Sequence, residues 1–392
     1  MTADAHDDAH WMELALQAAV RGRGAVEPNP MVGCVVVRND RVIASGFHAR
    51  FGGPHAEVVA LENLDPSELH DSTLYVSLEP CCHTGKTPPC VDLLLRKRPR
   101  RVVVAMLDPF PQVAGEGIAR LQQAGIAVDV GVMEGAARQL NVPYLKLLEH
   151  QRPWVIAKWA MTLDGALAAD SGDSKWISNE TSRLAVHRLR SVCDAVIIGS
   201  QTALRDDPLL TTRLPEGESP ARRAHRVVVD RQLRLPTSSQ LVTTAREWPL
   251  VVATLHPDGI APTDRAERTQ RIAQLQEAGA DVWMLPDGDP HAFVQDMLNE
   301  MGRRRWTNVL LEGGSKLLGV FWDAGHIDQV ECFIAPKILG SGSALTPVSG
   351  IAKDWMNQAR SLHRIQWEKL GDDFHFRGFT APCVENNDGI GR

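Results

Sequence analysis

The apolar positions along the chain follow two patterns. Some form short continuous runs, which are typical of buried strands, and others recur with the spacing of one face of a helix. Helical spacing from Trp11 to Ala19 predicts an opening helix. The first half then predicts strands at 32–37, 42–45, 74–78, 102–105 and 128–130, and helices at 56–63, 87–95, 117–124 and 138–150. This alternation predicts a mostly parallel sheet covered by helices.

The second half repeats the pattern after a break at Gln151-Arg152-Pro153. It predicts strands at 154–159, 195–198, 227–230, 250–253, 282–285, 309–311, 329–335 and 374–379, helices at 179–192, 265–278, 291–301 and 315–324, and a loop-rich passage at 202–226. We therefore expect one domain over residues 1–150, a second over residues 151–382, and a disordered tail over residues 383–392.

Composition narrows the class of protein. With 44% apolar and 23% charged residues, the 392-residue chain has the composition of a soluble globular protein. Its net charge of −6 gives no general attraction to nucleic acid or anionic membranes. The N-terminal residues lack the cationic start and apolar run of a secretory signal, and no apolar run is long enough to span a bilayer.

The cysteine count favours reduced thiols. Seven cysteines is ordinary usage for this length, and an odd number argues against a disulfide framework. We therefore expect a cytoplasmic protein. Cys34, Cys193 and Cys332 lie in apolar segments, where we expect small buried side chains rather than chemistry.

Four residues in the first half form a candidate metal site. His55 is followed two positions later by Glu57, and Cys81 follows Glu79-Pro80, with Cys90 further along. One imidazole and two thiolates can hold a catalytic zinc with a position left for water, and a glutamate can move protons. The motif falls on predicted junctions between strand, loop and helix, so two neighbouring helix N-termini would converge on one ion.

Two alternatives stay open for this motif. A core histidine beside a cysteine-rich turn would bind nothing. A structural zinc would take a fourth ligand, Cys82 or His83, and would leave Glu57 without a function. Because adjacent side chains point in different directions, we choose Cys81 over Cys82 as the ligand.

The wider motif resembles a known family. Pro28-Asn29-Pro30, Gly46-x-His48, Pro54-His55-Ala56-Glu57, the 78–90 segment and the 108–115 segment resemble the deaminase domain of bacterial bifunctional riboflavin-synthesis proteins. The eight residues between Cys81 and Cys90, unlike the two of other zinc deaminases, are the family's own spacing.

That resemblance implies a cytidine-deaminase-like three-layer α/β/α domain. It implies hydrolytic deamination of 2,5-diamino-6-(5-phosphoribosylamino)pyrimidin-4-one, with one zinc bound by His55, Cys81 and Cys90 and Glu57 as the catalytic acid and base. It also implies that Asn29 holds the pyrimidine, with His48, Lys86 and Asp108 as further candidates. Departures from the family pattern occur at Glu27, Lys86 and Phe110.

The second half lacks a Gly-x-Gly-x-x-Gly segment after a strand, so a Rossmann dinucleotide site is not supported. Glu312-Gly313-Gly314 does lie between a predicted strand and a predicted helix. Free backbone donors at that helix start could cradle a phosphate, although a glycine pair after a strand is more often a simple turn.

Here too the motifs resemble the same bifunctional family, in its reductase domain. They are Lys158-x-Ala160-x-Thr162-Leu163-Asp164-Gly165, Gly172-x-Ser174-x-Trp176, Asp206-Asp207-Pro208-x-Leu210, Leu311-Glu312-Gly313-Gly314 and Ala335-Pro336-Lys337. The resemblance implies a dihydrofolate-reductase-like α/β fold that uses NADPH to reduce the ribosyl group to ribityl, giving 5-amino-6-(5-phosphoribitylamino)uracil.

Matching positions imply the ligand contacts. Cofactor contacts would be Ala160, Trp176, Thr202, Asp206, Gly314, Ser315, Lys316, Leu317, Leu318, Gly319 and Val320. Substrate contacts would be Lys158, Ser174, Arg190, Leu210, Arg213 and Glu312. Arg190 and Arg213 suit the substrate's 5-phosphate because a guanidinium donates to two oxygens at once. Whether Lys158 or Glu312 handles the proton stays open. Arg231 stands where the family usually has a serine that contacts cofactor, and an arginine there could meet a 2′-phosphate.

The sequence therefore predicts a bifunctional zinc deaminase and NADPH reductase that acts on small pyrimidine ribosyl phosphates, without nucleic-acid or membrane partners. A homo-oligomer stays open. Three rival hypotheses are a nucleic-acid deaminase that flips bases, a zinc-stabilised module without activity, and a protein in which one domain has decayed.

Overall fold

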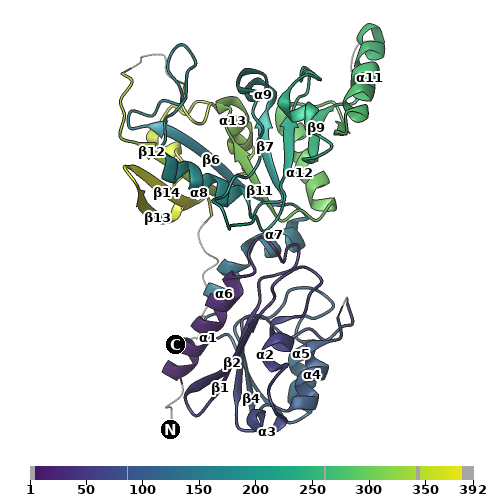
Figure 1. The fold of residues 1–392 in the computed structure, drawn as a ribbon, viewed down its shortest axis with the longest axis vertical. Helices are drawn as coiled ribbons and strands as arrows, with labels where there is room; N and C mark the ends of the chain where they lie inside the picture. Colours follow the sequence, from purple (N-terminus) through teal and green to yellow (C-terminus); the bar gives the residue numbers. More distant parts are fainter. Residues whose placement is uncertain (1–4, 86, 260–261, 341–344, 382–392) are drawn as a thin grey trace. The chain divides into compact units, whose positions relative to one another are not determined.

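A computed structural model describes residues 5–85, 87–259, 262–340 and 345–381. The chain forms two compact units that divide between His150 and Gln151, and each is described by itself (Figure 1). The predicted tail, residues 383–392, lies outside the described residues.

The first unit contains one sheet with the strand order β2-β1-β3-β4-β5. Its strands are β1 Gly33–Arg38, β2 Arg41–Phe47, β3 Thr73–Val76, β4 Arg101–Val104 and β5 Ala127–Val130. β3, β4 and β5 are parallel, but β1 pairs antiparallel with both β2 and β3. Two of the four strand pairings are therefore antiparallel, and the expectation of a mostly parallel sheet is wrong for β1 and β2. The turn after Arg38 folds β2 back on β1.

Helices cover both faces of this sheet. They are α1 Ala5–Val20, α2 Ala56–Leu61, α3 Pro66–Leu69, α4 Cys90–Lys97, α5 Glu116–Gln123, α6 Glu134–Leu140 and α7 Val142–His150. Alternate residues of β1 face opposite ways, as strand geometry requires. Cys34 and Val36 pack in a core with α2, α4 and α5, whereas Val35 and Val37 pack with α1, α6 and α7. The result is a three-layer α/β/α unit, with the metal-site residues on the face of α2 and α4.

One predicted helix of the first unit is two helices in the structure. The pattern at 138–150 predicts a single helix, but α6 ends at Leu140 and α7 begins at Val142. Pro143 has no N–H to continue the hydrogen-bond ladder. Asn141, between the two helices, bonds the backbone N–H and C=O of Met31 with its side chain.

The second unit contains a nine-stranded sheet with the order β10-β9-β8-β7-β11-β6-β12-β14-β13. Its strands are β6 Trp154–Thr162, β7 Ala195–Gly199, β8 His225–Val229, β9 Leu250–Leu255, β10 Asp281–Leu285, β11 Asn308–Glu312, β12 Gln329–Ala335, β13 His363–Leu370 and β14 Asp373–Phe379. In this order, neighbouring strands from β10 through β6 to β12 are parallel to one another. β14 pairs antiparallel with β12, and β13 pairs antiparallel with β14.

The helices of the second unit are α8 Glu180–Arg190, α9 Ser200–Asp206, α10 Gln240–Thr243, α11 Pro262–Glu277, α12 Pro290–Arg303 and α13 Ser315–Asp323. The main core lies between the parallel strands and the apolar faces of α12 and α13. Three elements of this unit were not predicted: α9, the short helix α10 and β13. α9 falls inside the passage expected to be loop-rich, and β13 is an edge strand with largely exposed residues, so it lacks the apolar alternation that marks a strand.

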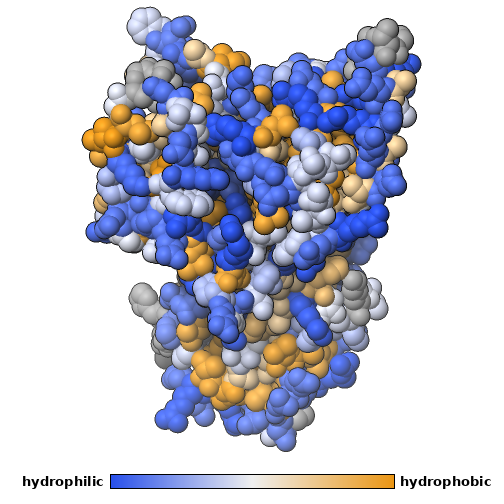
Figure 2. All heavy atoms as spheres, turned by 45° about the horizontal axis from the view of Figure 1, so that its top comes forward, coloured by the Kyte–Doolittle hydropathy of each residue, from blue (hydrophilic) through white to orange (hydrophobic). Residues whose placement is uncertain are grey.

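Polar side chains cover most of the face in Figure 2, with apolar residues in small separate groups. Among the described residues, no helix has both the length and the apolar character needed to cross a membrane.

Candidate active sites

Three predicted ligands in the first unit lie together. His55 caps the N-terminus of α2, Cys81 follows β3, and Cys90 is the first residue of α4. His55 Nδ1 lies 3.4 Å from Cys81 Sγ and 3.3 Å from Cys90 Sγ. Among the described residues these three form a group whose ligand atoms all lie within 4.8 Å of one another.

These separations fit a zinc ion. Zinc bonds of about 2.3 Å to sulfur and about 2.1 Å to nitrogen, at a tetrahedral angle, place nitrogen about 3.6 Å from each sulfur. The observed distances are close to that value. Thr87 Oγ1 lies 3.4 Å from His55 Nε2, and such a contact on the second ring nitrogen holds the ring with Nδ1 toward the sulfurs.

The local electrostatics also suit a cation. The Cys90 thiol and, at 3.3 Å, the Cys90 backbone N–H donate hydrogen bonds to Cys81 Sγ, and they lower the pKa of the Cys81 thiol to about 4. Cys81 is therefore a thiolate near neutral pH, which is the form that binds metal.

Glu57 lies in the first turn of α2, beside the ligand group, and is 3% exposed. Burial raises the pKa of Glu57 to about 7, and the negative charge of Cys81 adds to the rise. A carboxyl group in this position can accept a proton and return it near neutral pH.

The structure separates Cys82 from the ligand group. The Cys82 thiol donates to the Gln112 carbonyl oxygen at 3.4 Å instead of facing His55. Neither Cys82 nor His83 belongs to the group of potential ligands among the described residues. A three-ligand arrangement leaves room for a further ligand, as catalytic zinc sites require.

Sequence reasoning gave Glu79 no role, but its carboxylate organises the loops around Cys81. It accepts backbone hydrogen bonds from Gly115 at 2.9 Å, Gly117 at 3.1 Å and Asp108 at 3.3 Å. Glu79 is only 3% exposed, so each of these bonds is shielded from water. The sequence offered one signal for this role: Glu79 lies two residues before the predicted ligand Cys81.

Two polar side chains, those of His48 and Asn29, lie beside the ligand group. The His48 ring lies 5.3 Å from the His55 ring, its Nδ1 lies 3.0 Å from the Pro54 carbonyl oxygen, and its Nε2 lies 3.4 Å from Asn29 Nδ2. Burial lowers the pKa of His48, which favours the neutral ring. Because the amide nitrogen of Asn29 faces His48, the amide oxygen is left to accept from a ligand.

Of the other candidates in this unit, Asp108 is buried and accepts hydrogen bonds from the Phe110 N–H and the Tyr144 hydroxyl. The Phe110 ring lies 5.7 Å from the His83 ring. Lys86 lies outside the described residues.

The second unit contains a cleft of about 1070 Å³. All six residues expected to contact substrate line it, and so do all those expected to contact cofactor except Gly319. Gly319 packs instead under the 349–350 segment, where a Cβ atom would approach the Ser349 carbonyl oxygen to 2.2 Å. The cleft thus gathers residues from β6, β11, α8, α9 and α13.

A buried ion group lies where the end of β11 meets the middle of β6. Lys158 and Glu312 are register partners on these neighbouring strands. Glu312 accepts from Arg190 Nε at 2.5 Å and Nη2 at 2.8 Å, and Lys158 Nζ lies 4.0 Å from its carboxylate. Arg190 Nη1 donates to the Thr211 carbonyl oxygen at 3.2 Å, so each of the three guanidinium nitrogens makes a hydrogen bond inside the protein.

This pairing sets the charge states in the cleft. Burial raises the pKa of Glu312, but the charge and hydrogen bonds of Arg190 outweigh burial and lower the pKa to about 2. Burial lowers the pKa of Lys158. Burial and the charges of Arg190 and Arg213 lower the pKa of His187 to about 4. Glu312 is therefore ionised and His187 neutral near pH 7.

The cleft is strongly cationic although the whole chain is acidic. Eight lysine and arginine residues line it against two carboxylates: Lys158, Arg183, Arg190, Arg205, Arg213, Arg231, Arg234 and Lys316 against Asp206 and Glu312. Gly313 and Gly314 both have positive φ, which lets the chain turn directly from β11 into α13. The free N–H groups of that helix start add to the attraction for anions.

Comparisons with known proteins match each of the two units to a family. Residues 5–106 match the family model for the cytidine and deoxycytidylate deaminase zinc-binding region, and residues 153–376 match that for the RibD C-terminal domain. The riboflavin biosynthesis protein RibD of Actinobacillus pleuropneumoniae is 38% identical over 366 residues, covering 93% of both chains. RibD of Escherichia coli K12 is 35% identical over 368 residues, covering 88% of this chain and 92% of the relative.

Two solved structures are similar over nearly the whole chain. Acinetobacter baumannii RibD, form 1, has a TM-score of 0.82 at 32% identity and covers 96% of this chain and 100% of its own. A diaminohydroxyphosphoribosylaminopyrimidine deaminase/5-amino-6-(5-phosphoribosylamino)uracil reductase from Thermotoga maritima has a TM-score of 0.80 at 33% identity and covers 96% of this chain and 99% of its own.

Proposed function

Because the chain belongs to the RibD family of riboflavin biosynthesis proteins, we propose that each of its two units holds one of the family's two active sites. The protein is a bifunctional enzyme with a deaminase domain and a reductase domain, and the fold class expected from the sequence is confirmed. We assign the deaminase site to residues 1–150 and the reductase site to residues 151–382.

His55, Cys81 and Cys90 are the zinc ligands in this proposal. The observation that supports it most is the match between the nitrogen–sulfur separations and a tetrahedral zinc site. When bound, zinc supplies a Lewis acid that activates water for attack on the amino-bearing ring carbon. Glu57 takes a proton from that water and gives it to the departing nitrogen, so that ammonia leaves.

Asn29 and His48 orient the pyrimidine. His48 fixes the Asn29 amide through its Nε2, so that Asn29 Oδ1 accepts from an N–H of the ring or its amino substituents. The substrate we propose is 2,5-diamino-6-(5-phosphoribosylamino)pyrimidin-4-one, in keeping with the name of the Thermotoga maritima relative as a diaminohydroxyphosphoribosylaminopyrimidine deaminase.

The reductase site is the cationic cleft of the second unit, with NADPH as its cofactor. The turn at Gly313-Gly314 and the start of α13 take cofactor phosphate, and Ala160, Trp176, Thr202 and Asp206 complete the cofactor wall. NADPH supplies the hydride that converts the ribosyl group to ribityl, and the protein orients the two partners.

Within this cleft, Arg190 and Arg213 have different roles. The guanidinium of Arg190 is engaged with Glu312 and Thr211, so Arg190 orients Glu312 instead of gripping the 5-phosphate. Arg213 is then the phosphate contact. Glu312, held ionised by Arg190, steadies positive charge that develops during ring opening.

Lys158 is the proton donor for the reduction. Its pKa is lowered by burial, which brings the ammonium group closer to proton release near neutral pH, whereas Glu312 carries no proton there. We also infer that the enzyme works in the cytoplasm on small molecules, because seven cysteines, an odd and ordinary number for this length, favour reduced thiols.

Two half-reactions test the proposal separately. Full-length zinc-loaded protein should release ammonia from the diaminopyrimidinone, and the deaminated product should then oxidise NADPH. Glu57→Gln should cut ammonia release by about 10²- to 10⁴-fold and leave NADPH oxidation intact. Lys158→Arg should do the reverse, because arginine keeps the charge but does not release its proton.

If Glu57→Gln releases ammonia at the wild-type rate, the acid–base role of Glu57 is wrong. Full NADPH oxidation by Lys158→Arg would show that charge at this position is enough and that Lys158 is no proton donor.

A further inference from the structure

A second group of cations lies in the reductase cleft away from the ion group of Lys158 and Glu312. Arg231 and Arg234 follow β8 and line the cleft, whereas Lys158 is on β6. In the sheet, β7 and β11 lie between these strands. With strands about 4.8 Å apart, about 14 Å separates β8 from β6. A dinucleotide is long enough to meet both groups.

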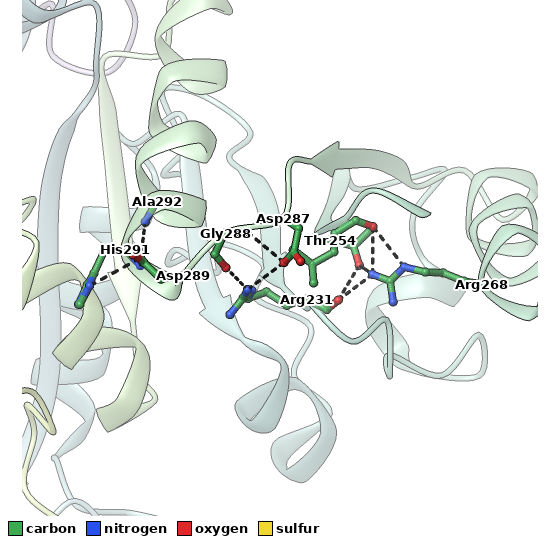
Figure 3. Close-up of polar contacts among 9 residues, drawn as sticks. Arg231, Thr254, Arg268, Asp287, Gly288, Asp289, His291 and Ala292 are labelled. Atoms are coloured by element: carbon green, nitrogen blue, oxygen red, sulfur yellow. Dashed lines mark hydrogen bonds and ion pairs between the residues drawn. The ribbon is translucent and has the colours of Figure 1, made fainter. Parts of the chain in front are cut away.

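Arg231 has unused capacity to bind an anion. In Figure 3 its guanidinium points toward the Asp287-Gly288 segment, where Nη2 donates to the Gly288 carbonyl oxygen and lies 3.7 Å from Asp287 Oδ1. Its carbon lies 5.5 Å from the centre of the Phe293 ring. Its Nε is buried and has no hydrogen-bond partner among the described residues. A buried donor without a partner is costly, and a bound anion would relieve that cost.

The backbone that carries Arg231 is fixed. Arg268 Nη2 donates to the Arg231 carbonyl oxygen at 2.7 Å and to Thr254 Oγ1 at 2.6 Å (Figure 3). Thr254 in turn donates to the Asp230 carbonyl oxygen at 2.8 Å. Arg234 is held on the opposite side of the turn by a bond from its Nη2 to Ser200 Oγ at 2.9 Å. Both arginines are thus presented from an ordered turn, which lowers the entropy cost of binding.

Asp230 is turned away from the cleft. It is fully buried, and its Oδ2 accepts from the Leu235 N–H at 2.8 Å, which closes the turn between the two arginines. This site is not of the Rossmann type, but the same chemistry applies: in Rossmann sites an acidic side chain binds the ribose 2′-hydroxyl, while an arginine accommodates a 2′-phosphate. Here the acid has a structural role, and the arginines face the cleft.

We propose that Arg231 and Arg234 form the subsite for the 2′-phosphate of NADPH, and that Asp287 competes with this phosphate for Arg231. The inference rests on the proposed NADPH-dependent reductase. The Asp287 carboxylate is half-exposed, at 54%, so its pairing with Arg231 is weak and a phosphate can displace it.

Adenosine 2′,5′-bisphosphate and adenosine 5′-monophosphate are the probes, because they differ only in the 2′-phosphate. Their affinities for the full-length zinc-loaded protein are measured by titration calorimetry. Arg231→Gln should weaken the bisphosphate about 10- to 100-fold and change the monophosphate less than about twofold. Arg234→Gln should act in the same direction. Asp287→Asn should tighten the bisphosphate about two- to fivefold.

Arg246→Gln is the matched control, since Arg246 is an exposed arginine of the same unit outside the cleft. It should leave both affinities unchanged. NADPH and NADH are titrated in parallel, so that the subsite and the cofactor are tested separately.

If Arg231→Gln and Arg234→Gln keep the wild-type preference for the bisphosphate while NADPH still binds, the subsite is wrong and the proposed reductase stands. If wild-type protein binds NADPH and NADH equally, the 2′-phosphate is not recognised, and the inference is overturned. If it binds neither, the inference and the proposed cofactor both fail.

Discussion

Replacing Glu312 by glutamine removes one charge from the buried ion group of the reductase cleft. The carboxylate balances Arg190, through two hydrogen bonds, and Lys158 at 4.0 Å. Glutamine has nearly the same shape but leaves two buried cations without their counter-ion. Loss of one partner of such a group is strongly destabilising.

The magnitude follows from the pKa of Glu312. Its fall from 4.5 to about 2, at a side chain only 9% exposed, corresponds to about 3 kcal/mol. A lowered pKa gives stability that is fully present above the unfolded value and is lost as the pH falls toward the folded value. We therefore expect Glu312→Gln to lower the free energy of unfolding by about 3 kcal/mol at pH 7, and by less below about pH 4.

Urea unfolding followed by tryptophan fluorescence measures this loss. Nine of the ten tryptophans lie at position 154 or later, and only Trp11 precedes them, so the signal reports mainly on the second unit. The midpoint should fall by roughly 1 M urea or more at pH 7. Glu216→Gln, in an exposed turn of the same unit, is the control and should unfold close to wild type.

Equal midpoints for Glu312→Gln and wild type at pH 7 would show that the carboxylate contributes no net stability. A gap that stays the same from pH 7 to pH 3 would show that the loss has another cause, such as repacking around the amide.

Three further outcomes are expected. A strong zinc chelator should abolish ammonia release but leave NADPH oxidation with the deaminated product intact, and loss of both activities would contradict separate sites. Glu79→Gln should weaken zinc retention about tenfold in a chelator competition, because the amide cannot accept the backbone bonds from Asp108, Gly115 and Gly117 as a carboxylate does. Glu13→Gln, at an exposed position of α1 in the same unit, should retain zinc like wild type. Burial lowers the pKa of His375, but contacts with Glu331 and Glu368 outweigh burial and raise it above 6.5. NMR titration should therefore give His375 a pKa above 6.5. The contribution of the protonated ring to stability is complete below pH 6.5 and is lost as the pH rises through the folded pKa. A ring that is already neutral at pH 6 would refute this.

The local sequence determined the elements and the chemistry of both sites. Apolar periodicity is a property of neighbouring residues, so most strands and helices and the α/β class followed from it. The residue types of the His55, Glu57, Cys81 and Cys90 motif likewise limit the chemistry, because imidazole and thiolates are zinc ligands whatever surrounds them.

Tertiary structure decided what depends on distant partners. The choice between Cys81 and Cys82 follows from where the Gln112 carbonyl lies. The contact between Arg190 and Glu312, 122 positions away, is the observation behind our proposal that Arg190 orients this carboxylate. The antiparallel pairing of β1 and the exposed strand β13 depend on neighbours in the sheet. Side-chain partners and strand order depend on contacts between segments far apart in the chain, and local periodicity does not reveal those contacts.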